Sequence, residues 1–97
     1  MSKKITFLEA IRQAQLEEMV RDERVFIMGE DIVCNVFGTT TGFVEQFGLA
    51  RVRDTPISEN ALVGAAAGAS MVGARPIVDL MFGDFIFLIM DQLCNQA

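Results

Sequence analysis

The sequence lacks histidine, tryptophan and tyrosine altogether. Acid–base chemistry by an imidazole must therefore come from outside these residues. Only two cysteines are present, Cys34 and Cys94, and neither belongs to a CxxC pair. A disulfide scaffold and a metal site are not expected, and free thiols fit a reducing compartment, so the sequence predicts a cytoplasmic protein without a metal of its own.

Clustered basic charge and long apolar runs are also missing. Lys and Arg number 8 against 13 Asp and Glu, and the net charge of −5 argues against nucleic-acid binding. The first six residues have no apolar core of the kind found in signal peptides. The most apolar stretch, residues 80–90, is interrupted by Asp84 and is too short to span a bilayer, so no membrane partner is expected.

The chain is rich in apolar residues for its length. Hydrophobic residues make up 52% of the 97 positions and charged residues only 22%. One small domain has little interior in which to bury them, so part of this surface is expected to pack against something else. Residues 91–97 stop inside a helical pattern without a Gly, a Pro or a basic last turn. We therefore expect residues 1–97 to be the N-terminal part of a longer polypeptide.

The first predicted element is a helix that ends near residues 21–22. Thr6 and Glu9 have the spacing of a capping box, in which the Thr hydroxyl caps the helix and the Glu side chain reaches back. Apolar residues then recur at helical spacing and are expected to face the core: Leu8, Ile11, Ala14, Met19 and Val20.

A short apolar run predicts a buried strand over residues 25–28, and further strands are expected over residues 51–55 and 75–82. Helices are expected over residues 41–47, 60–73 and 85–96, after a loop at 32–41. In the last helix, Asp84 is the expected cap, and Leu88, Ile89 and Leu93 are expected to face inward. The alternation of helices and strands indicates an α/β fold, with a parallel sheet flanked by helices on both sides.

A glycine and two acids, Gly29, Glu30 and Asp31, follow the first predicted strand. In open α/β sheets, ligands bind just beyond the carboxyl ends of the strands, so these acids are candidates for a binding site. A solvated turn, or an Asp31 that caps a helix, would explain the same residues.

Residues 54–73 are the most informative stretch, with the sequence DTPISENALVGAAAGASMVG. Pro56 favours an extended segment before it, and Ser58 can cap the helix that Glu59 begins. Gly64 and Gly68 lie one turn apart on a face with almost no bulk, so another backbone can approach closely. Each feature has two interpretations. Glu59 is either an anion stabilised by the helix terminus or a catalytic carboxyl group, and the glycine face packs either on its own sheet or on another subunit.

Several ordered motifs resemble those of a known family: GED at 29–31, DTPISE at 54–59, RPIVDLMF at 75–82, and Glu59 followed by the two glycines. They extend over residues 5–97 and resemble the beta subunit of the thiamine-diphosphate-dependent decarboxylase component of 2-oxo acid dehydrogenases, such as pyruvate dehydrogenase. The resemblance implies a transketolase-like pyrimidine-binding domain. Residues 1–97 would be its N-terminal part, and the rest of that domain and a C-terminal domain would lie outside this chain.

The same resemblance implies that the aminopyrimidine of thiamine diphosphate binds beside Glu59 and Glu30, with Ile57 and Phe85 against the ring. Glu59 would be catalytic: its carboxyl group, sheltered from water, exchanges a proton with ring N1′ and so turns the cofactor's own amino group into a base. On pattern alone, Phe85 and Phe87 are better explained as core residues.

The resemblance also implies partners. The sequence has no Gly-Asp-Gly diphosphate motif, which in the family belongs to the alpha subunit, together with magnesium. The expected enzyme contains two alpha and two beta chains. It decarboxylates a pyruvate-like 2-oxo acid and passes the acyl group to the lipoyl arm of a dihydrolipoyl acyltransferase. An acetoin dehydrogenase beta subunit shares these motifs, and a one-chain transketolase-like enzyme or a non-catalytic association module are more distant alternatives.

Overall fold

A computed structural model of the chain describes residues 4–34 and 38–97, so residues 35–37 of the predicted loop lie outside the described part. Three parallel strands form a sheet in the order β2-β1-β3, with β1 at Val25–Gly29, β2 at Val52–Asp54 and β3 at Arg75–Asp79. The long helices are α1 at Phe7–Arg21 and α3 at Glu59–Met71, and α2 is a short helix at Phe43–Phe47. The strands and these helices begin and end within about three residues of their predicted limits, except that β3 stops early.

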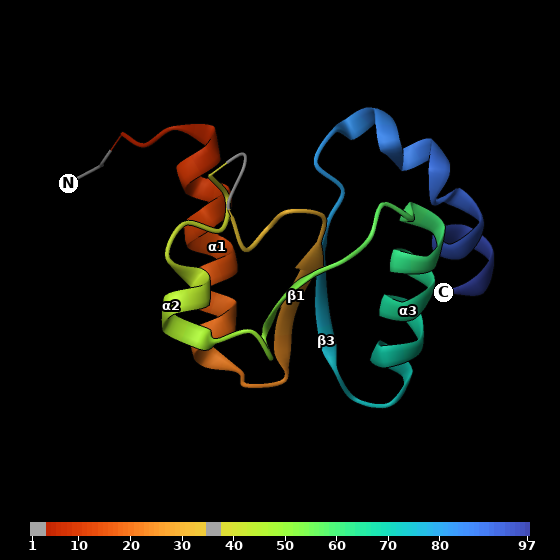
Figure 1. The fold of residues 1–97 in the computed structure, drawn as a ribbon, viewed down its shortest axis with the longest axis horizontal. Coiled ribbons are helices and arrows are strands. Elements are labelled where there is room, and N and C mark those ends of the chain that lie inside the picture. Colours follow the sequence, from red (N-terminus) through yellow and green to blue (C-terminus); the bar gives the residue numbers. More distant parts are fainter. Residues whose placement is uncertain (1–3, 35–37) are drawn as a thin grey trace.

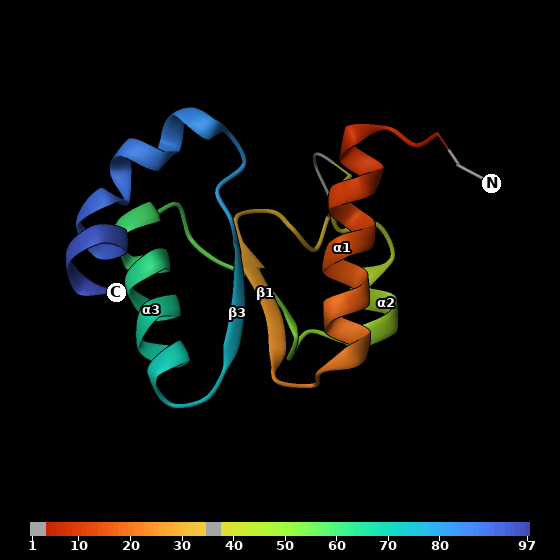
Figure 2. The same ribbon diagram turned by 180° about the vertical axis from the view of Figure 1, so that it is seen from behind.

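The sheet lies between two helical layers. Helices α1 and α2 cover one face, and α3 with the C-terminal segment covers the other (Figure 1). The view from behind shows the same three layers, with the sheet in the middle (Figure 2). The predicted α/β fold with a parallel sheet covered on both sides is therefore confirmed.

Helix α1 begins as predicted at Thr6, whose Oγ1 accepts a hydrogen bond from the Glu9 backbone N–H at 3.1 Å. The Glu9 carboxylate accepts hydrogen bonds from Arg12 (Nη1–Oε1 3.3 Å) and from Gln13 (Nε2–Oε1 3.5 Å), further along the helix. The predicted cap by the Thr6 hydroxyl is therefore present. The Glu9 side chain supports the first turns of α1 through its hydrogen bonds with Arg12 and Gln13.

The predicted apolar stripe of α1 is largely wrong. Met19 is fully buried, but Leu8 and Ile11 are each 41% exposed, Val20 is 63% exposed and Ala14 is also exposed. The sequence reasoning missed Leu16, which packs against the core together with Met19. Leu16 and Met19, in the second half of α1, are the residues of this helix that pack against the core.

Arg51 links the C-terminal end of α1 to the start of β1. Arg51 Nη2 donates hydrogen bonds to the carbonyl oxygens of Met19, Asp22 (3.0 Å) and Val25 (2.8 Å), and its guanidinium lies over the Phe47 ring at 4.8 Å. Free carbonyl groups at a helix C-terminus attract a cation. This contact explains why α1 meets the sheet through its C-terminal end.

The core lies mainly between β1, α1 and α2, and its buried members are Met19, Val25, Ile27, Ile32, Phe43 and Val52. Burial along β1 alternates, because Val25 and Ile27 are buried while Phe26 and Met28 are half-buried. The predicted burial of β1 on both faces is therefore complete only on the face toward α1. On the other face, α3 contributes Leu62, Val63 and Ala66, and Ile89 packs there as well.

The C-terminal quarter differs most from the prediction. Strand β3 ends at Asp79 instead of residue 82, because Met81 has a left-handed backbone (φ 71°) that cannot continue a strand. The predicted helix over residues 85–96 is two short pieces: a 3₁₀ helix, η1, at Gly83–Leu88, and a π-helix, η2, at Asp91–Gln96.

These two helical forms explain the errors in the predicted inward face. A 3₁₀ helix has about 3.0 residues per turn instead of 3.6, so the α-helical spacing no longer selects one face. Ile89 is buried as predicted, but Leu88 and Leu93 are exposed. Asp84 lies in the first turn of η1, where Phe82 and not Asp84 occupies the cap position.

Candidate functional site

The predicted site residues lie at one edge of the molecule. Glu30 follows β1, Ile57 and Glu59 follow β2, and Phe85 lies in η1, which follows β3. Because the three strands are parallel, their carboxyl ends meet at the same edge of the sheet, toward which the β1 arrow points in Figure 1. The topology therefore gathers residues that are up to 55 positions apart in the sequence.

Gly29, the last residue of β1, explains how the chain closes this edge. It is in register with Asp54 on β2 and Asp79 on β3, and its carbonyl oxygen accepts a hydrogen bond from Thr55 N–H at 2.9 Å. A Cβ atom on Gly29 would lie 2.7 Å from the Asp79 carbonyl oxygen, so a side chain does not fit. The segment after β2 is thereby drawn over the end of β1, toward Glu30.

Glu30 and Glu59 interact directly. Burial raises the pKa of Glu30 above its ordinary value, the negative charge of Glu59 and a hydrogen bond with its carboxyl group raise this pKa further, and the charge of Asp31 adds to the effect. Glu30 and Glu59 are both half-buried within the described chain. A raised pKa means that the Glu30 carboxyl group retains a proton more readily than an isolated glutamate does.

The start of α3 places Glu59 beside free backbone amides. Ser58 occupies the predicted cap position, but its side chain makes no capping hydrogen bond in the described structure. Asp31, which we considered as a cap, instead adopts a left-handed turn (φ 52°) directly after Glu30. Glu59 therefore provides the acidic group at the positive end of the α3 dipole.

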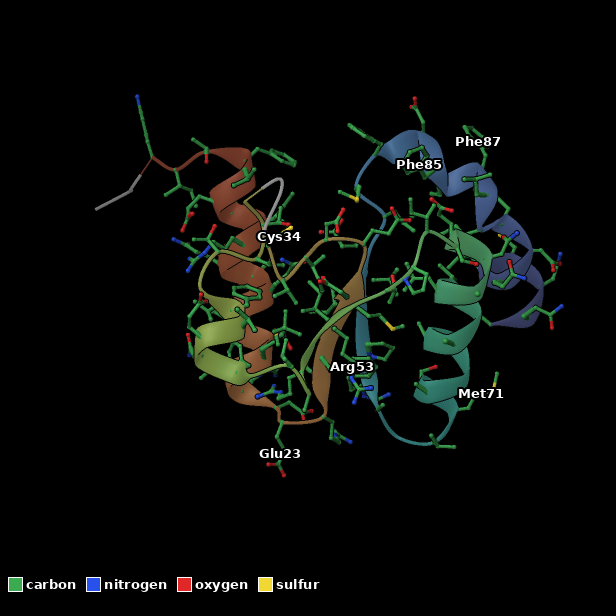
Figure 3. The ribbon with its side chains drawn as sticks, in the orientation of Figure 1. Glu23, Cys34, Arg53, Met71, Phe85 and Phe87 are labelled. Atoms are coloured by element: carbon green, nitrogen blue, oxygen red, sulfur yellow. The ribbon has the colours of Figure 1, made fainter. Side chains whose placement is uncertain are left out.

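Apolar side chains with exposed surface occur in the segments that follow β2 and β3 at this edge of the sheet. Ile57 is 81% exposed, and Phe85 is half-buried with its ring edge-to-face against Phe82 (centroids 5.5 Å apart, interplanar angle 85°). Figure 3 shows Phe85 on η1, with Phe87 beyond it at the outer side. Phe87 is 79% exposed, so its assignment to the core is wrong. Exposed apolar side chains of this kind are typical of a ligand site or a protein interface.

The two glycines of α3 have different surroundings. A Cβ atom on Gly64 would lie 3.4 Å from Cγ of Gln92, so Gly64 faces η2 of the same chain. A Cβ atom on Gly68 would meet nothing within 4 Å. Within this chain the close-packing interpretation therefore applies to Gly64, and the surface at Gly68 is open.

Comparison with known proteins identifies the domain. Residues 3–97 match the family described as transketolase, pyrimidine binding domain. The chain belongs to this family. The resemblance found in the sequence motifs is thereby confirmed, and the sheet edge that holds Glu30 and Glu59 is an edge of a pyrimidine-binding domain.

Relatives of this pyrimidine-binding domain are beta subunits. The chain is 45% identical over 95 residues to the 2-oxoisovalerate dehydrogenase subunit beta of Bacillus subtilis, and 46% identical over 95 residues to the pyruvate dehydrogenase E1 component subunit beta of Rickettsia bellii; each match covers 96% of this chain and 29% of the relative. It is 41% identical over 111 residues to the acetoin:2,6-dichlorophenolindophenol oxidoreductase subunit beta of Bacillus subtilis, covering 100% of this chain and 32% of the relative. The chain thus spans about a third of the length of these relatives.

Three further features of the described residues concern metal ligands, membrane-spanning helices and a groove. No group of three or more His, Cys, Asp or Glu side chains in residues 4–34 and 38–97 is placed to hold a metal ion. In the same part of the chain, no helix has the length and apolar character to cross a membrane. A groove of about 590 Å³ lies between α3, β3 and the C-terminal segment, with a mostly apolar lining, and does not include the carboxyl pair.

Replacing Glu30 with Gln tests the carboxyl pair by its effect on stability. A carboxyl group whose pKa is raised in the folded state costs stability when it ionises, and this cost is full above the folded pKa and absent below the unfolded value of about 4.3. Glu30→Gln therefore raises the midpoint of thermal unfolding at neutral pH, and the gain disappears as the pH falls below about 4. Differential scanning calorimetry across a pH series measures the unfolding midpoint. An increase of the midpoint that is the same at every pH would contradict the effect of Glu59 on Glu30.

Proposed function

We propose that this chain is the N-terminal part of the beta subunit of a thiamine-diphosphate-dependent 2-oxo acid dehydrogenase, and that Glu59 activates the cofactor's aminopyrimidine. The single observation that carries the proposal is the interacting pair of Glu30 and Glu59, with a raised Glu30 pKa, at the carboxyl edge of a pyrimidine-binding domain. The names of the relatives support the reaction class.

The chemistry of the residues at this edge suits an aminopyrimidine. The ring carries a basic nitrogen and two flat apolar faces. The pair of Glu30 and Glu59 offers a carboxyl group that can give and take a proton, and Ile57 and Phe85 offer apolar surface in segments at the same edge of the sheet. When bound, thiamine diphosphate supplies the electron sink that the decarboxylation of a 2-oxo acid requires.

The two carboxyl groups have different tasks in this proposal. Glu59, fixed at the first residue of α3, hydrogen-bonds to the ring nitrogen and exchanges a proton with it. Burial and the negative charge of Glu59 raise the pKa of Glu30, so Glu30 holds a proton beside Glu59 more readily than an isolated glutamate does.

The proposal includes partner chains. An alpha subunit supplies the diphosphate and magnesium site in an assembly of two alpha and two beta chains, and a dihydrolipoyl acyltransferase receives the acyl group. The exposed apolar side chains near the carboxyl pair, Ile57, Phe82 and Phe87, support burial against another chain. The remainder of the beta subunit covers the second edge of β3, which pairs only with β1 among the described strands.

A second candidate function is that of an acetoin dehydrogenase beta subunit, which the acetoin oxidoreductase relative favours. The same cofactor residues would serve both reactions. The two functions would differ in the residues that bind the substrate, and activity assays identify the substrate. A non-catalytic association module remains the alternative from another class, and it needs no proton exchange at Glu59.

The test uses the full-length protein produced together with its alpha chain. We expect release of CO₂ from a 2-oxo acid that depends on added thiamine diphosphate. Assays with pyruvate, branched-chain 2-oxo acids and acetoin in parallel distinguish the substrates. Cleavage of acetoin alone would favour the second candidate, and a stable complex that neither binds thiamine diphosphate nor turns over any of these substrates would favour the module.

Replacing Gly68 with Leu tests the interface on α3. The open surface at Gly68 accepts the larger side chain within this chain, and Leu favours the helix, so the beta chain still folds. If an alpha chain packs closely on this face, Gly68→Leu weakens association by at least about tenfold, because an inserted side chain overpacks the contact. Gel filtration and analytical ultracentrifugation measure the association of the alpha and beta chains, with Gly68→Ala as the matched control. An unchanged heterotetramer for Gly68→Leu would show that the interface lies elsewhere.

A further inference from the structure

A carboxylate at the end of β3 joins two segments of chain at the candidate site. Asp79 Oδ1 accepts a hydrogen bond from the backbone N–H of Met81 at 2.8 Å, and Asp79 Oδ2 accepts one from Thr39 Oγ1 at 3.2 Å. Thr39 belongs to the loop that begins with Glu30, and Met81 belongs to the turn that leads to Phe85. We call these three residues, Thr39, Asp79 and Met81, the Asp79 clamp.

The Asp79 clamp stabilises the left-handed backbone conformation of Met81. Met81 has φ 71°, in the left-handed region that residues other than glycine rarely adopt and that costs free energy. The hydrogen bond from its N–H to Asp79 favours this turn, as Asp side chains do when they bond to the backbone two residues on. The turn ends β3 and directs the chain into η1.

The clamp also lies beside Glu30. A hollow of about 10 Å³, room for about one water molecule, is lined by Glu30, Asp31, Ile32, Thr39, Thr40, Asp79 and Met81. Thr40 is buried and its hydroxyl donates to the Ile32 carbonyl oxygen at 2.8 Å, which closes the loop around this hollow. All members of the Asp79 clamp therefore form walls of the hollow that holds Glu30.

We propose that Asp79 is a positioning residue for the carboxyl pair. By holding Thr39 and Met81 in place, it fixes two walls of the hollow beside Glu30 and limits the access of water to the Glu30 carboxyl group. This inference rests on the proposed function, because the pair acts on the aminopyrimidine only if Glu30 stays beside Glu59. Asp79 itself makes no contact with the reacting atoms in this proposal.

Three charged groups lie near Glu30: Glu59 from α3, Asp31 from its own loop, and Asp79 from β3, which lines the same hollow. All are acids. A change at Asp79 therefore removes a charge as well as the clamp, whereas a change at Thr39 removes one arm of the clamp and leaves every charge in place.

The experiment uses the full-length protein with its alpha chain and measures the dissociation constant of thiamine diphosphate by titration calorimetry across a pH series. Thr39→Val removes the hydroxyl donor, and we expect about fivefold weaker binding. Because water then reaches Glu30 and lowers its pKa, the pH at which binding begins to weaken on the alkaline side moves down. Thr39→Ser keeps the donor and stays within about twofold of the wild type. Asp79→Ala, which removes both arms, weakens binding by about tenfold or more.

The outcomes separate the clamp from a purely structural role. If Thr39→Val lowers the melting temperature but leaves the dissociation constant and its pH dependence unchanged, the positioning role is wrong. If Asp79→Ala does not fold, Thr39→Val and Thr39→Ser still decide the question. A wild-type complex that does not bind thiamine diphosphate would overturn the proposed function itself, and the clamp with it.

Discussion

Replacing Glu59 with Gln in the full-length complex lowers turnover by about 10³-fold, while the subunits still assemble. Glutamine has almost the same shape as glutamate and can still hydrogen-bond to a ring nitrogen, but it cannot exchange a proton with it. Glu59 is the first residue of α3, whose geometry an amide also tolerates, so the helix should remain intact. Steady-state release of CO₂ measures turnover, and gel filtration measures assembly.

Glu23→Gln is the matched control for this change. Glu23 is exposed and lies beyond the opposite end of the sheet from the candidate site, as Figure 3 shows. The same loss of one negative charge there should leave turnover within about twofold of the wild type, because surface charges far from a site have little effect. If Glu59→Gln behaves like Glu23→Gln, the carboxyl group is a structural helix-terminal anion and not catalytic.

Replacing Phe43 with Ala destabilises the fold by about 3–5 kcal/mol. Phe43 is fully buried in the core between α1, α2 and the sheet, and its ring meets Phe47 edge-to-face with centroids 6.0 Å apart. Removing it leaves a cavity that the small α2 helix cannot fill. A domain of this size has little stability to spare, so much of the chain is expected to be unfolded at 37 °C. Urea denaturation followed by circular dichroism measures the loss.

The control for Phe43 is another phenylalanine of the same chain. Phe87 is 79% exposed, and Phe87→Ala should change the stability of the isolated chain by less than about 0.5 kcal/mol. Equal losses for the two variants would mean that the core is not centred on Phe43. A loss at Phe87 that appears only in the assembled complex would indicate that a partner chain covers it.

The strand and helix order was predictable because each signal is local. The apolar run at β1 predicts a strand, and Ser58, Glu59 and the small residues after them predict the start and length of α3. The pairing of Glu30 with Glu59 came from the family resemblance, and the parallel strands bring the segments that hold both residues to the same edge of the sheet.

Features that depend on contacts between distant residues were not predictable. The inward face of α1 depends on where Arg51 holds its last turn, 29 residues away from Asp22 in the sequence. The form of η1 and η2 depends on how residues 83–96 pack over α3, which helical spacing does not determine. The Asp79 clamp joins residues 40 positions apart, and its only sequence signal is that β2 and β3 both end in an aspartate.

The most direct test of the account is a crystal structure of the full-length protein with its alpha chain and bound thiamine diphosphate. We predict a Glu59 carboxyl oxygen at about 2.6–3.0 Å from a nitrogen of the pyrimidine ring, with Glu30 in contact with Glu59. Glu59 directed into bulk solvent, with the pyrimidine held by other residues, would contradict the central claim.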